Sequence, residues 1–370
     1  MNRFESMSSG KRVVVLAGTG LLICALLAAL FEGGVRVRQW LKYGSVFAGV
    51  ESLYHDDPVT GLRTAVPGLR TKGININALG FRGPEITDPK PAGTIRIAFM
   101  GGSTTISAEV GRDEATWPHL VTARLRERWP DHRFDYINAG VSGYTAESSL
   151  KNLERRVKRL DPDLIVIYHA TNDLSVNGYQ AALAQGVIEE SNKGDMSLSW
   201  PSKYSLLWYL VEKNLKVMSL QNQAEEDTGK LDADARLLAE PFERDLIGLV
   251  EASREVADVV ALVTFSIRMR ADQDQATRLS GAQTSLYYMP YMTPDSLIDS
   301  FAAYNDVIRE VGRALDVIVI EGEDTVPGDE THFMDSVHFS EAGSQVMANR
   351  VADDLIGQGA LQRLGLPASP

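Results

Sequence analysis

The chain has 370 residues, of which 44% are hydrophobic and 23% charged, so it can bury a large core and is not disordered throughout. Its formal net charge of −12 argues against a nucleic-acid partner, because binding a phosphate backbone requires clustered lysine and arginine. The single cysteine, Cys24, excludes an intrachain disulfide and says little about the redox compartment.

An uncharged apolar run lies near the N-terminus. It covers residues 13–31, which is close to the length that crosses the hydrocarbon core of a bilayer, and it follows an N-terminal arm of residues 1–12. We predict a single-pass transmembrane anchor, with the arm inside and the large domain in the periplasm or outside the cell. A cleaved signal peptide is the main alternative, although the run is long for one and no good cleavage site follows it. A buried helix of a soluble protein is the weaker alternative.

The rest of the chain divides into a connecting region and an α/β domain. Residues 32–92 are rich in turn-forming residues and are expected to connect the anchor to a domain at 93–360. In that domain the pattern predicts strands at 94–100, 134–138, 163–168, 259–265 and 316–320, and helices near 117–129, 147–160, 242–256, 296–315 and 340–356. This alternation predicts a central parallel sheet of about five strands that is covered by helices on both faces.

Residues 174–240 interrupt the alternation of strands and helices. The segment contains a plausible amphipathic helix at 204–218, followed by a polar, acidic stretch. It is therefore interpreted as an insertion, and two roles stay open: a lid over the site, or an extension that only adds packing.

Candidate catalytic residues follow the predicted strands, where ligands bind in open parallel sheets. Ser103 comes after the first strand, Gly140 after the second and Asn172 after the third, and Asp335 and His338 share a loop before the last helix. Acyl transfer needs these parts: a serine nucleophile, a histidine base and an acid that orients the base. The Ser103 and Gly140 N–H groups and the Asn172 side-chain amide are natural donors for an oxyanion hole.

Four short blocks around these residues resemble the SGNH (GDSL-type) hydrolase superfamily. The serine block resembles residues 100–105, with Gly-Gly-Ser in place of Gly-Asp-Ser, and the glycine block matches residues 138–143. The asparagine block matches residues 170–173 except that Ala170 replaces a glycine, and the Asp-x-x-His block matches residues 335–338. Residues 77–83 also resemble a lead-in that precedes the serine block in many bacterial members.

The resemblance implies a flavodoxin-like three-layer sandwich and an esterase that works through an acyl-enzyme, with no cofactor and no metal. The expected substrate is a small-molecule or polysaccharide ester, such as an O-acetyl or other short acyl group on a carbohydrate or cell-envelope molecule. Two alternatives stay open: an O-acyltransferase that uses the same triad, and a catalytically retired domain that binds glycan or protein. A nucleotide-binding protein is disfavoured because residues 101–103 lack the P-loop lysine and a dinucleotide glycine pattern.

Several other polar residues receive structural interpretations. Asp173 is expected to brace its loop, and His169 to be a packed structural histidine. His332 has no required chemical role, although a metal site with Asp335 and His338 is possible in principle. Arg268 and Arg270 are interpreted as a solvated pair, with binding of an anionic substrate group as the alternative.

Overall fold

The computed structural model describes residues 8–43, 53–71, 73–188, 199–224 and 229–368. Its centre is a five-stranded parallel sheet in the order β4-β3-β5-β6-β7, which confirms the predicted fold class. The strands are β3 (Thr94–Gly101), β4 (Arg133–Asn138), β5 (Leu164–Tyr168), β6 (Val259–Val263) and β7 (Ile318–Ile320). Every residue of β5 and β6 is buried, as expected for apolar strands whose two faces are both covered.

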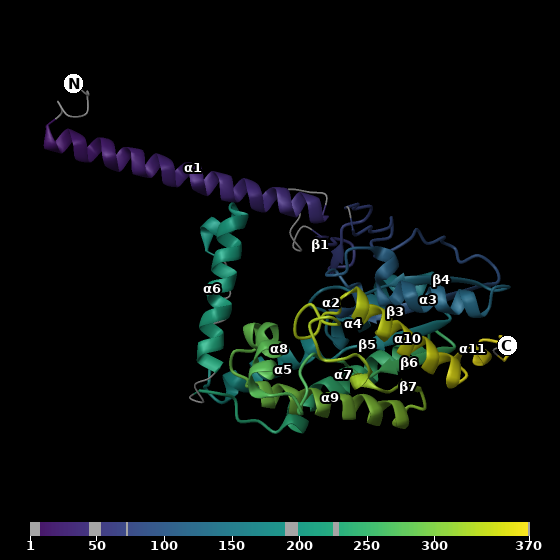
Figure 1. Ribbon diagram of the computed structural model, residues 1–370. Helices are drawn as coiled ribbons and strands as arrows, with labels where there is room; N and C mark the ends of the chain where they lie inside the picture. The colour runs from purple at the N-terminus through teal and green to yellow at the C-terminus, as the bar shows by residue number, and fades with distance from the viewer. Residues whose placement is uncertain (1–7, 44–52, 72, 189–198, 225–228, 369–370) are drawn as a thin grey trace.

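Helices cover both faces of the sheet (Figure 1). The helices of the domain are α2 (Ser103–Ile106), α3 (Trp117–Arg128), α4 (Ala146–Asn152), α5 (Thr171–Ala184), α6 (Leu206–Ala224), α7 (Ala235–Arg254), α8 (Gln275–Tyr288), α9 (Pro294–Ala314), α10 (Glu341–Gly357) and α11 (Ala360–Arg363). On one face α3 packs against α10, and on the other α7 packs against α4, α5 and α9. Right-handed crossovers between parallel strands produce this division.

Besides the short helices α2 and α11, two longer helices of the domain, α5 and α8, are not among those expected from the sequence. Helix α8 follows β6, and its apolar pattern is interrupted by Gly281 and several polar residues. Helix α5 begins directly at the asparagine block, so the predicted insertion at 174–240 starts inside a helix. Helix α6 covers most of the predicted amphipathic helix, while residues 189–198 and 225–228 of the insertion lie outside the described residues.

The apolar N-terminal run belongs to a longer helix than expected. Helix α1 (Ser9–Tyr43) continues for twelve residues beyond the predicted end at residue 31. Residues 9–38 are long and apolar enough to cross a membrane: their most apolar window of 18 residues has a mean hydropathy of 2.7, and none of that window is buried inside the protein. One such helix fits a membrane anchor, and a signal sequence has the same properties.

The predicted connecting region packs on the α/β domain over its described part. Strands β1 (Tyr54–Asp56) and β2 (Arg63–Ala65) form an antiparallel pair. Their apolar side chains and those of Ile74 and Ile76 join a second buried cluster, to which the domain contributes Ile106, Ala108, Val141 and Tyr144. The region is thus a layer beside the site rather than only a linker.

Arg82, in the lead-in segment, holds this layer to the loop that follows α2. Its buried guanidinium pairs with Asp113 at 2.8 Å. The other guanidinium N–H groups donate to four backbone carbonyls, those of Gly73, Ile106, Ser107 and Val110. A buried charge is tolerated only where such partners satisfy it.

Arg82→Met should therefore destabilise the protein strongly, by about 3–5 kcal/mol, because it leaves Asp113 without its buried partner. Arg112→Met is the matched control, since Arg112 pairs with Glu341 on the surface, where solvent screens the pair, and its loss should change the stability far less. Urea unfolding of the detergent-solubilised full chain measures both. Equal losses for the two variants would contradict the role given to Arg82.

Candidate active site

The register of the sheet brings the three strand-end blocks to one edge. In β3, Phe99 lies beside Asn138 of β4, and Gly101 lies beside Tyr168 of β5. The chain leaves all three strands within a few residues of these pairs. Parallel pairing therefore places the segments that carry Ser103, Gly140 and Asn172 next to one another.

Ser103, His338 and Asp335 form a connected series of side chains. Ser103 is the first residue of α2, and its Oγ lies 2.7 Å from His338 Nε2. His338 Nδ1 lies 2.8 Å from Asp335 Oδ2. The other oxygen of Asp335 accepts the N–H groups of Val337 and His338 at 3.0 and 2.9 Å, so the carboxylate is held by its own loop. This is the arrangement of a nucleophile, a base and a group that orients the base.

The loop that presents His338 is fixed on both sides. Phe333 and Phe339 are buried, form an isolated β-bridge and have ring centroids 5.2 Å apart. The N–H of Met334 donates to the His338 carbonyl at 2.8 Å. Directly afterwards Ser340 caps α10 by accepting the Gly343 N–H. The histidine thus lies on a closed loop whose two ends are anchored in the core.

Asn172 lies in the first turn of α5 and approaches the backbone before Ser103. Its Nδ2 donates to the Tyr144 carbonyl at 2.9 Å, which leaves its second amide N–H for another acceptor. A Cβ at position 102 would lie 2.6 Å from this nitrogen. The Asn172 amide therefore occupies the space that the missing side chain of Gly102 leaves open.

Gly140 packs directly against α2. A Cβ here would lie 2.4 Å from the Ile106 backbone nitrogen, so a glycine is needed for packing. Its N–H donates to Asn138 Oδ1 at 3.2 Å. The N–H of Ser103, by contrast, is at the first position of a helix, where no intrahelical acceptor exists. The three predicted oxyanion donors thus differ. The Ser103 N–H has no intrahelical acceptor and Asn172 has a second amide N–H available, whereas the Gly140 N–H already donates to Asn138.

Glu109 is a residue near the site that sequence reasoning missed. Its Oε1 lies 3.9 Å from His338 Nε2, and its Oε2 is buried without a hydrogen-bond partner among the described residues. Burial lowers the pKa of His338, but the carboxylates of Glu109 and Asp335 outweigh it and raise this pKa to about 9. The charge of Lys213, on α6, acts in the lowering direction. Nothing in the sequence distinguishes Glu109 from other acidic residues.

The carboxyl group of Asp335 responds to the same partners. Burial raises the pKa of this carboxyl group. The charge of His338 and the hydrogen bonds that Asp335 accepts from His338 and Val337 outweigh burial, so the net shift of the pKa is downward. Asp335 therefore stays ionised while His338 changes its charge. An ionised acid stabilises the imidazolium that forms when the histidine takes a proton.

A second histidine in the same loop, His332, also pairs with an aspartate but does not contact Ser103. His332 Nδ1 lies 2.8 Å from Asp329 Oδ1, so the Asp-x-x-His spacing occurs twice. Only His338 reaches Ser103. Within the described ranges, no group of three or more His, Cys, Asp or Glu side chains is arranged to hold a metal ion.

His169 and Asp173 are buried beneath the site. His169 Nε2 lies 2.7 Å from Ser149 Oγ, and burial lowers its pKa to about 3, so it stays neutral. Asp173 accepts the Ala146 N–H at 2.9 Å and thereby ties α5 to the start of α4. Burial raises the pKa of Asp173 to about 7. Both residues thus have the structural positions expected for them.

Arg268 and Arg270 do not form a solvated pair. The side chain of Arg268 is 12% exposed and pairs with Glu330 at 2.9 Å, and that of Arg270 is 15% exposed and pairs with Asp324 at 3.0 Å. Arg270 also donates to three backbone carbonyls of the surrounding loops. The two arginines are therefore engaged in holding loops, and this corrects the interpretation from the sequence.

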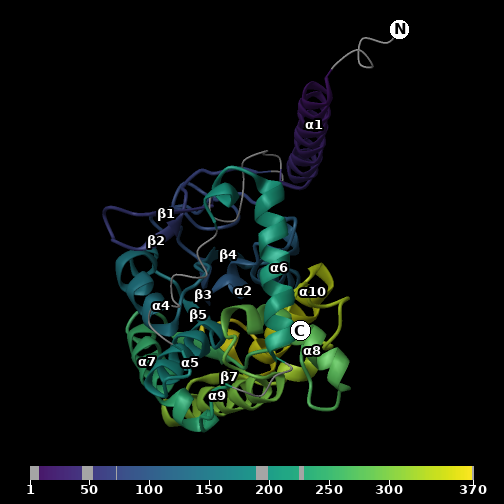
Figure 2. The same cartoon turned by 90° about the vertical axis from the view of Figure 1, so that its left-hand side faces the viewer.

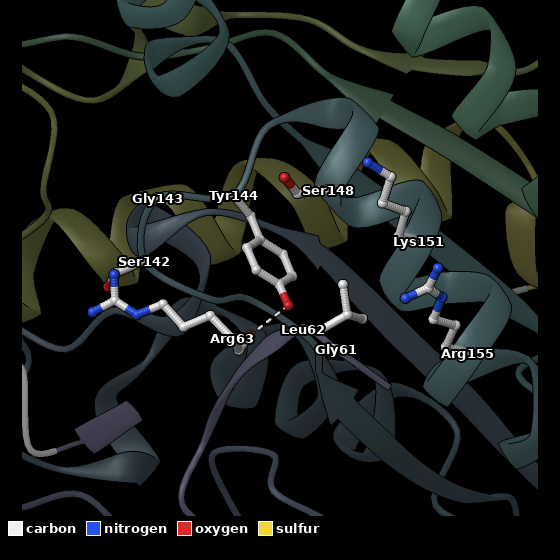
Figure 3. A pocket seen from close by; sticks show the side chains of 9 residues that line it. All are labelled: Gly61, Leu62, Arg63, Ser142, Gly143, Tyr144, Ser148, Lys151 and Arg155. Carbon is white, nitrogen blue, oxygen red and sulfur yellow. Dashed lines mark hydrogen bonds between the residues drawn. The ribbon is translucent and has the colours of Figure 1, made fainter. Parts of the chain in front are cut away.

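A hollow of about 460 Å³ lies beside the loop that follows Gly140. Figure 3 shows Arg63 on one side of it and Lys151 and Arg155 on the other, with the Tyr144 ring between them. The Tyr144 hydroxyl donates to the Arg63 carbonyl at 2.5 Å, while the backbone of Tyr144 accepts from Asn172. Tyr144 thus links the hollow to the catalytic side of the loop.

With this geometry established, the relationship of the chain to known proteins is clear. The sequence model of the GDSL-like lipase/acylhydrolase family matches residues 99–346, which is more than half of the chain. The chain belongs to this family and is an esterase of the SGNH type. No curated protein matches the chain.

Three hydrolases are among the solved structures that match the chain. An α/β hydrolase named LAE5, from the metagenome of Lake Arreo, Spain, is 17% identical with a TM-score of 0.42, over 70% of this chain and 94% of its own. The acetylxylan esterase Axe2 from Geobacillus stearothermophilus is 15% identical with a TM-score of 0.41, over 75% and 96%. A lipase/acylhydrolase from Enterococcus faecalis is 18% identical with a TM-score of 0.40, over 71% and 96%.

The raised pKa of His338 predicts an alkaline activity profile. A base with a pKa of about 9 is mostly neutral only above that pH, so the acid limb of kcat/KM should lie near it. Glu109→Gln removes one cause of the rise and should move this limb to lower pH, toward the ordinary histidine pKa of 6.5. The measurement is the pH dependence of ester hydrolysis. The control is Glu127→Gln on the exposed side of α3, and an unmoved limb in Glu109→Gln would contradict the assignment.

Proposed function

We propose that the chain is a serine-dependent hydrolase that cleaves its ester through an acyl-enzyme, with Ser103 as nucleophile, His338 as base and Asp335 as the group that orients the base. The observation that carries this proposal is the unbroken series of contacts from Ser103 Oγ through both ring nitrogens of His338 to Asp335. The family to which the chain belongs catalyses ester hydrolysis, and these contacts supply the parts that such a reaction requires.

The proposed reaction has two halves. Ser103 Oγ attacks the ester carbonyl while its proton passes to His338 Nε2, and the resulting imidazolium returns the proton to the departing alkoxide oxygen. The bond between the acyl carbon and the alcohol breaks, and the acyl group stays on Ser103. Water then attacks the acyl-enzyme with His338 as base, which releases the carboxylic acid and restores the serine.

Three donors are assigned to the oxyanion that forms in each half. They are the N–H groups of Ser103 and Gly140 and the side-chain amide of Asn172. Ser103 and Asn172 have unused donor capacity, which supports their assignment. Gly140 contributes only if its N–H turns from Asn138 Oδ1, which holds it at a distance of 3.2 Å. We therefore assign the larger share of stabilisation to Ser103 and Asn172.

The proposed substrate is a short acyl ester on a carbohydrate or another cell-envelope molecule. Polar side chains surround the triad: the charges of Glu109 and Lys213 act on His338, and the charge of Asp335 in turn raises the pKa of Tyr288. The Glu109 side chain is 27% exposed, and that of Tyr288 is 53% exposed. Such a rim suits a hydroxyl-rich substrate better than a long acyl chain, which needs an apolar channel.

We assign α1 the role of a single-pass membrane anchor, with the catalytic domain in the periplasm or outside the cell. The side chains of its apolar window are exposed, and a bilayer would cover them. The helix also makes specific polar contacts with α6 through Glu32 and Arg36, which a signal peptide removed after targeting has no need to make.

Ser103→Ala and His338→Ala should each reduce kcat for hydrolysis of p-nitrophenyl acetate by at least about 10⁴-fold, and the double variant should be no worse than either alone, because the two residues act as a unit. His332→Ala is the matched control. It removes a histidine of the same loop that also pairs with an aspartate, and should keep wild-type activity. Undiminished activity of Ser103→Ala would refute the proposed nucleophile.

Asn172→Ala should lower kcat by about 10²–10³-fold with little change in KM, since an oxyanion donor acts mainly in the transition state. Steady-state kinetics on the same ester measure this split. Gln180→Ala, an exposed change on the same helix, is the control and should match wild type. A rise in KM at constant kcat would show that Asn172 binds the ground state instead.

A further inference from the structure

One face of α6 carries an apolar stripe that the described part of the protein leaves largely exposed. Tyr204, just before the helix, and Trp208, Val211, Leu215 and Met218 within it have side chains between 42% and 70% exposed. Their spacing of four, three, four and three residues places them along one side of a helix. An exposed stripe of this length on a soluble surface marks an interaction site.

The opposite side of α6 faces the catalytic domain. Helix α6 packs against α8, and Tyr209 interacts with Tyr288 of that helix. The charge of Lys213 acts on His338, as described above. Tyr209 and Lys213 lie about half a turn around the helix from the stripe centred on Leu215 and Val211. The stripe therefore points away from the domain.

The N-terminus of α6 is fastened to α1 where the apolar run ends. The Glu32 carboxylate accepts the N–H groups of Leu206 and Leu207 at 3.1 and 2.9 Å and the Ser205 hydroxyl at 2.8 Å. A carboxylate at a helix N-terminus satisfies free N–H groups and favours the helix dipole. Arg36 pairs with Glu32 at 2.7 Å and donates to the Tyr204 carbonyl at 3.0 Å. These contacts fix α6 at the level of Glu32.

The two helices run in different directions. In Figure 1, α6 runs crosswise to α1, and the catalytic domain lies on one side of α6 while the N-terminal part of α1 extends to the other. Figure 2, turned about the vertical axis, again shows α6 descending from the domain end of α1. If α1 crosses a bilayer along its own axis, α6 lies along the surface of that bilayer, with its stripe toward the lipid.

The composition of the stripe fits this surface. The end of the stripe near α1 is aromatic, with Tyr204 and, one turn later, Trp208. Trp200, which is 73% exposed, packs against Tyr204 in a tilted arrangement with ring centroids 5.4 Å apart. Tryptophan and tyrosine concentrate where hydrocarbon meets lipid headgroups. The far end, with Leu215 and Met218, is aliphatic. Amphipathic helices of this kind bury their apolar face at the boundary of headgroups and acyl chains.

We propose that α6 is an interfacial helix that lays the stripe formed by Tyr204, Trp208, Val211, Leu215 and Met218 in the surface of the bilayer that α1 crosses. This inference rests on the membrane anchorage of α1 proposed above. Because Lys213, on the opposite side of the same helix, is near enough for its charge to act on His338, the catalytic site lies on the domain side of α6. The substrate is then an ester displayed close to the membrane surface.

Fluorescent labelling of the full chain in lipid nanodiscs tests the proposal. The discs contain phosphatidylcholine with a minor share of phosphatidylglycerol, with or without phosphatidylcholine that carries a nitroxide quencher on its acyl chain. An environment-sensitive nitrobenzoxadiazole label is placed on native Cys24 in α1, or, in a Cys24→Ser background, on Leu215→Cys or Lys213→Cys. We expect the nitroxide lipid to quench the labels at 24 and 215, and to leave the label at 213 on the opposite face unquenched.

The other outcomes overturn the proposal in distinguishable ways. Quenching at 24 but not at 215 refutes the interfacial helix and leaves the anchor intact, whereas no quenching at 24 refutes the anchor and this inference with it. A label at 215 that is shielded from water, insensitive to the nitroxide lipid and cross-linkable to a second copy assigns the stripe to a dimer instead. Nitroxide quenching of wild-type tryptophan emission, compared with Trp208→Phe, repeats the test without a cysteine variant. Equal quenching of these two proteins contradicts the proposal.

Discussion

Parallel pairing of β3 with β4 on one side and β5 on the other is the constraint on which the site depends. The observed register ends the three strands within a few residues of one another, so the three loops that leave them share one edge. Ser103 and Asn172 begin helices at that edge, and Gly140 follows β4 in a turn. The loop with His338 is anchored separately, by the Phe333–Phe339 bridge, and closes over the serine from the far end of the chain.

Close packing at this edge explains the small residues around the serine. A side chain at 102 would collide with the Asn172 amide, and one at 140 would collide with the backbone of α2. The loop after α2 is in turn held by the buried Arg82, whose guanidinium satisfies four carbonyls and pairs with Asp113. Glu109 lies on this loop, so the lead-in segment also sets the position of the second carboxylate near His338.

Helix α6 connects the site to the N-terminal helix. One side of it contributes Lys213 to the charges around His338, and its N-terminus is capped by Glu32 of α1. Through α6 the insertion therefore contacts both the catalytic domain and α1. Its exposed stripe faces away from the domain, and under the proposed anchorage of α1 this is the side on which the bilayer lies.

The α/β fold, the family and the residue types of the site are predictable from local patterns in the sequence. Strand periodicity and the four short motifs depend only on residues that are close together in the sequence, so the sequence is sufficient to predict them. Tertiary structure decided what depends on distance in space. Asp329–His332 and Asp335–His338 have the same spacing, and only the fold brings His338 to a serine 235 positions away.

The same reason explains what the sequence did not reveal. Glu109 is one of many carboxylates until packing places it 3.9 Å from His338 Nε2, and the Gly140 N–H is a free donor until Asn138 accepts it. Arg268 and Arg270 are not solvated, because Glu330 and Asp324, which lie more than 50 positions away in the sequence, form ion pairs with them. Charges, donors and exposed faces acquire their roles from neighbours that are distant in sequence, because electrostatic and hydrogen-bond energies depend on separation in space and not on chain position.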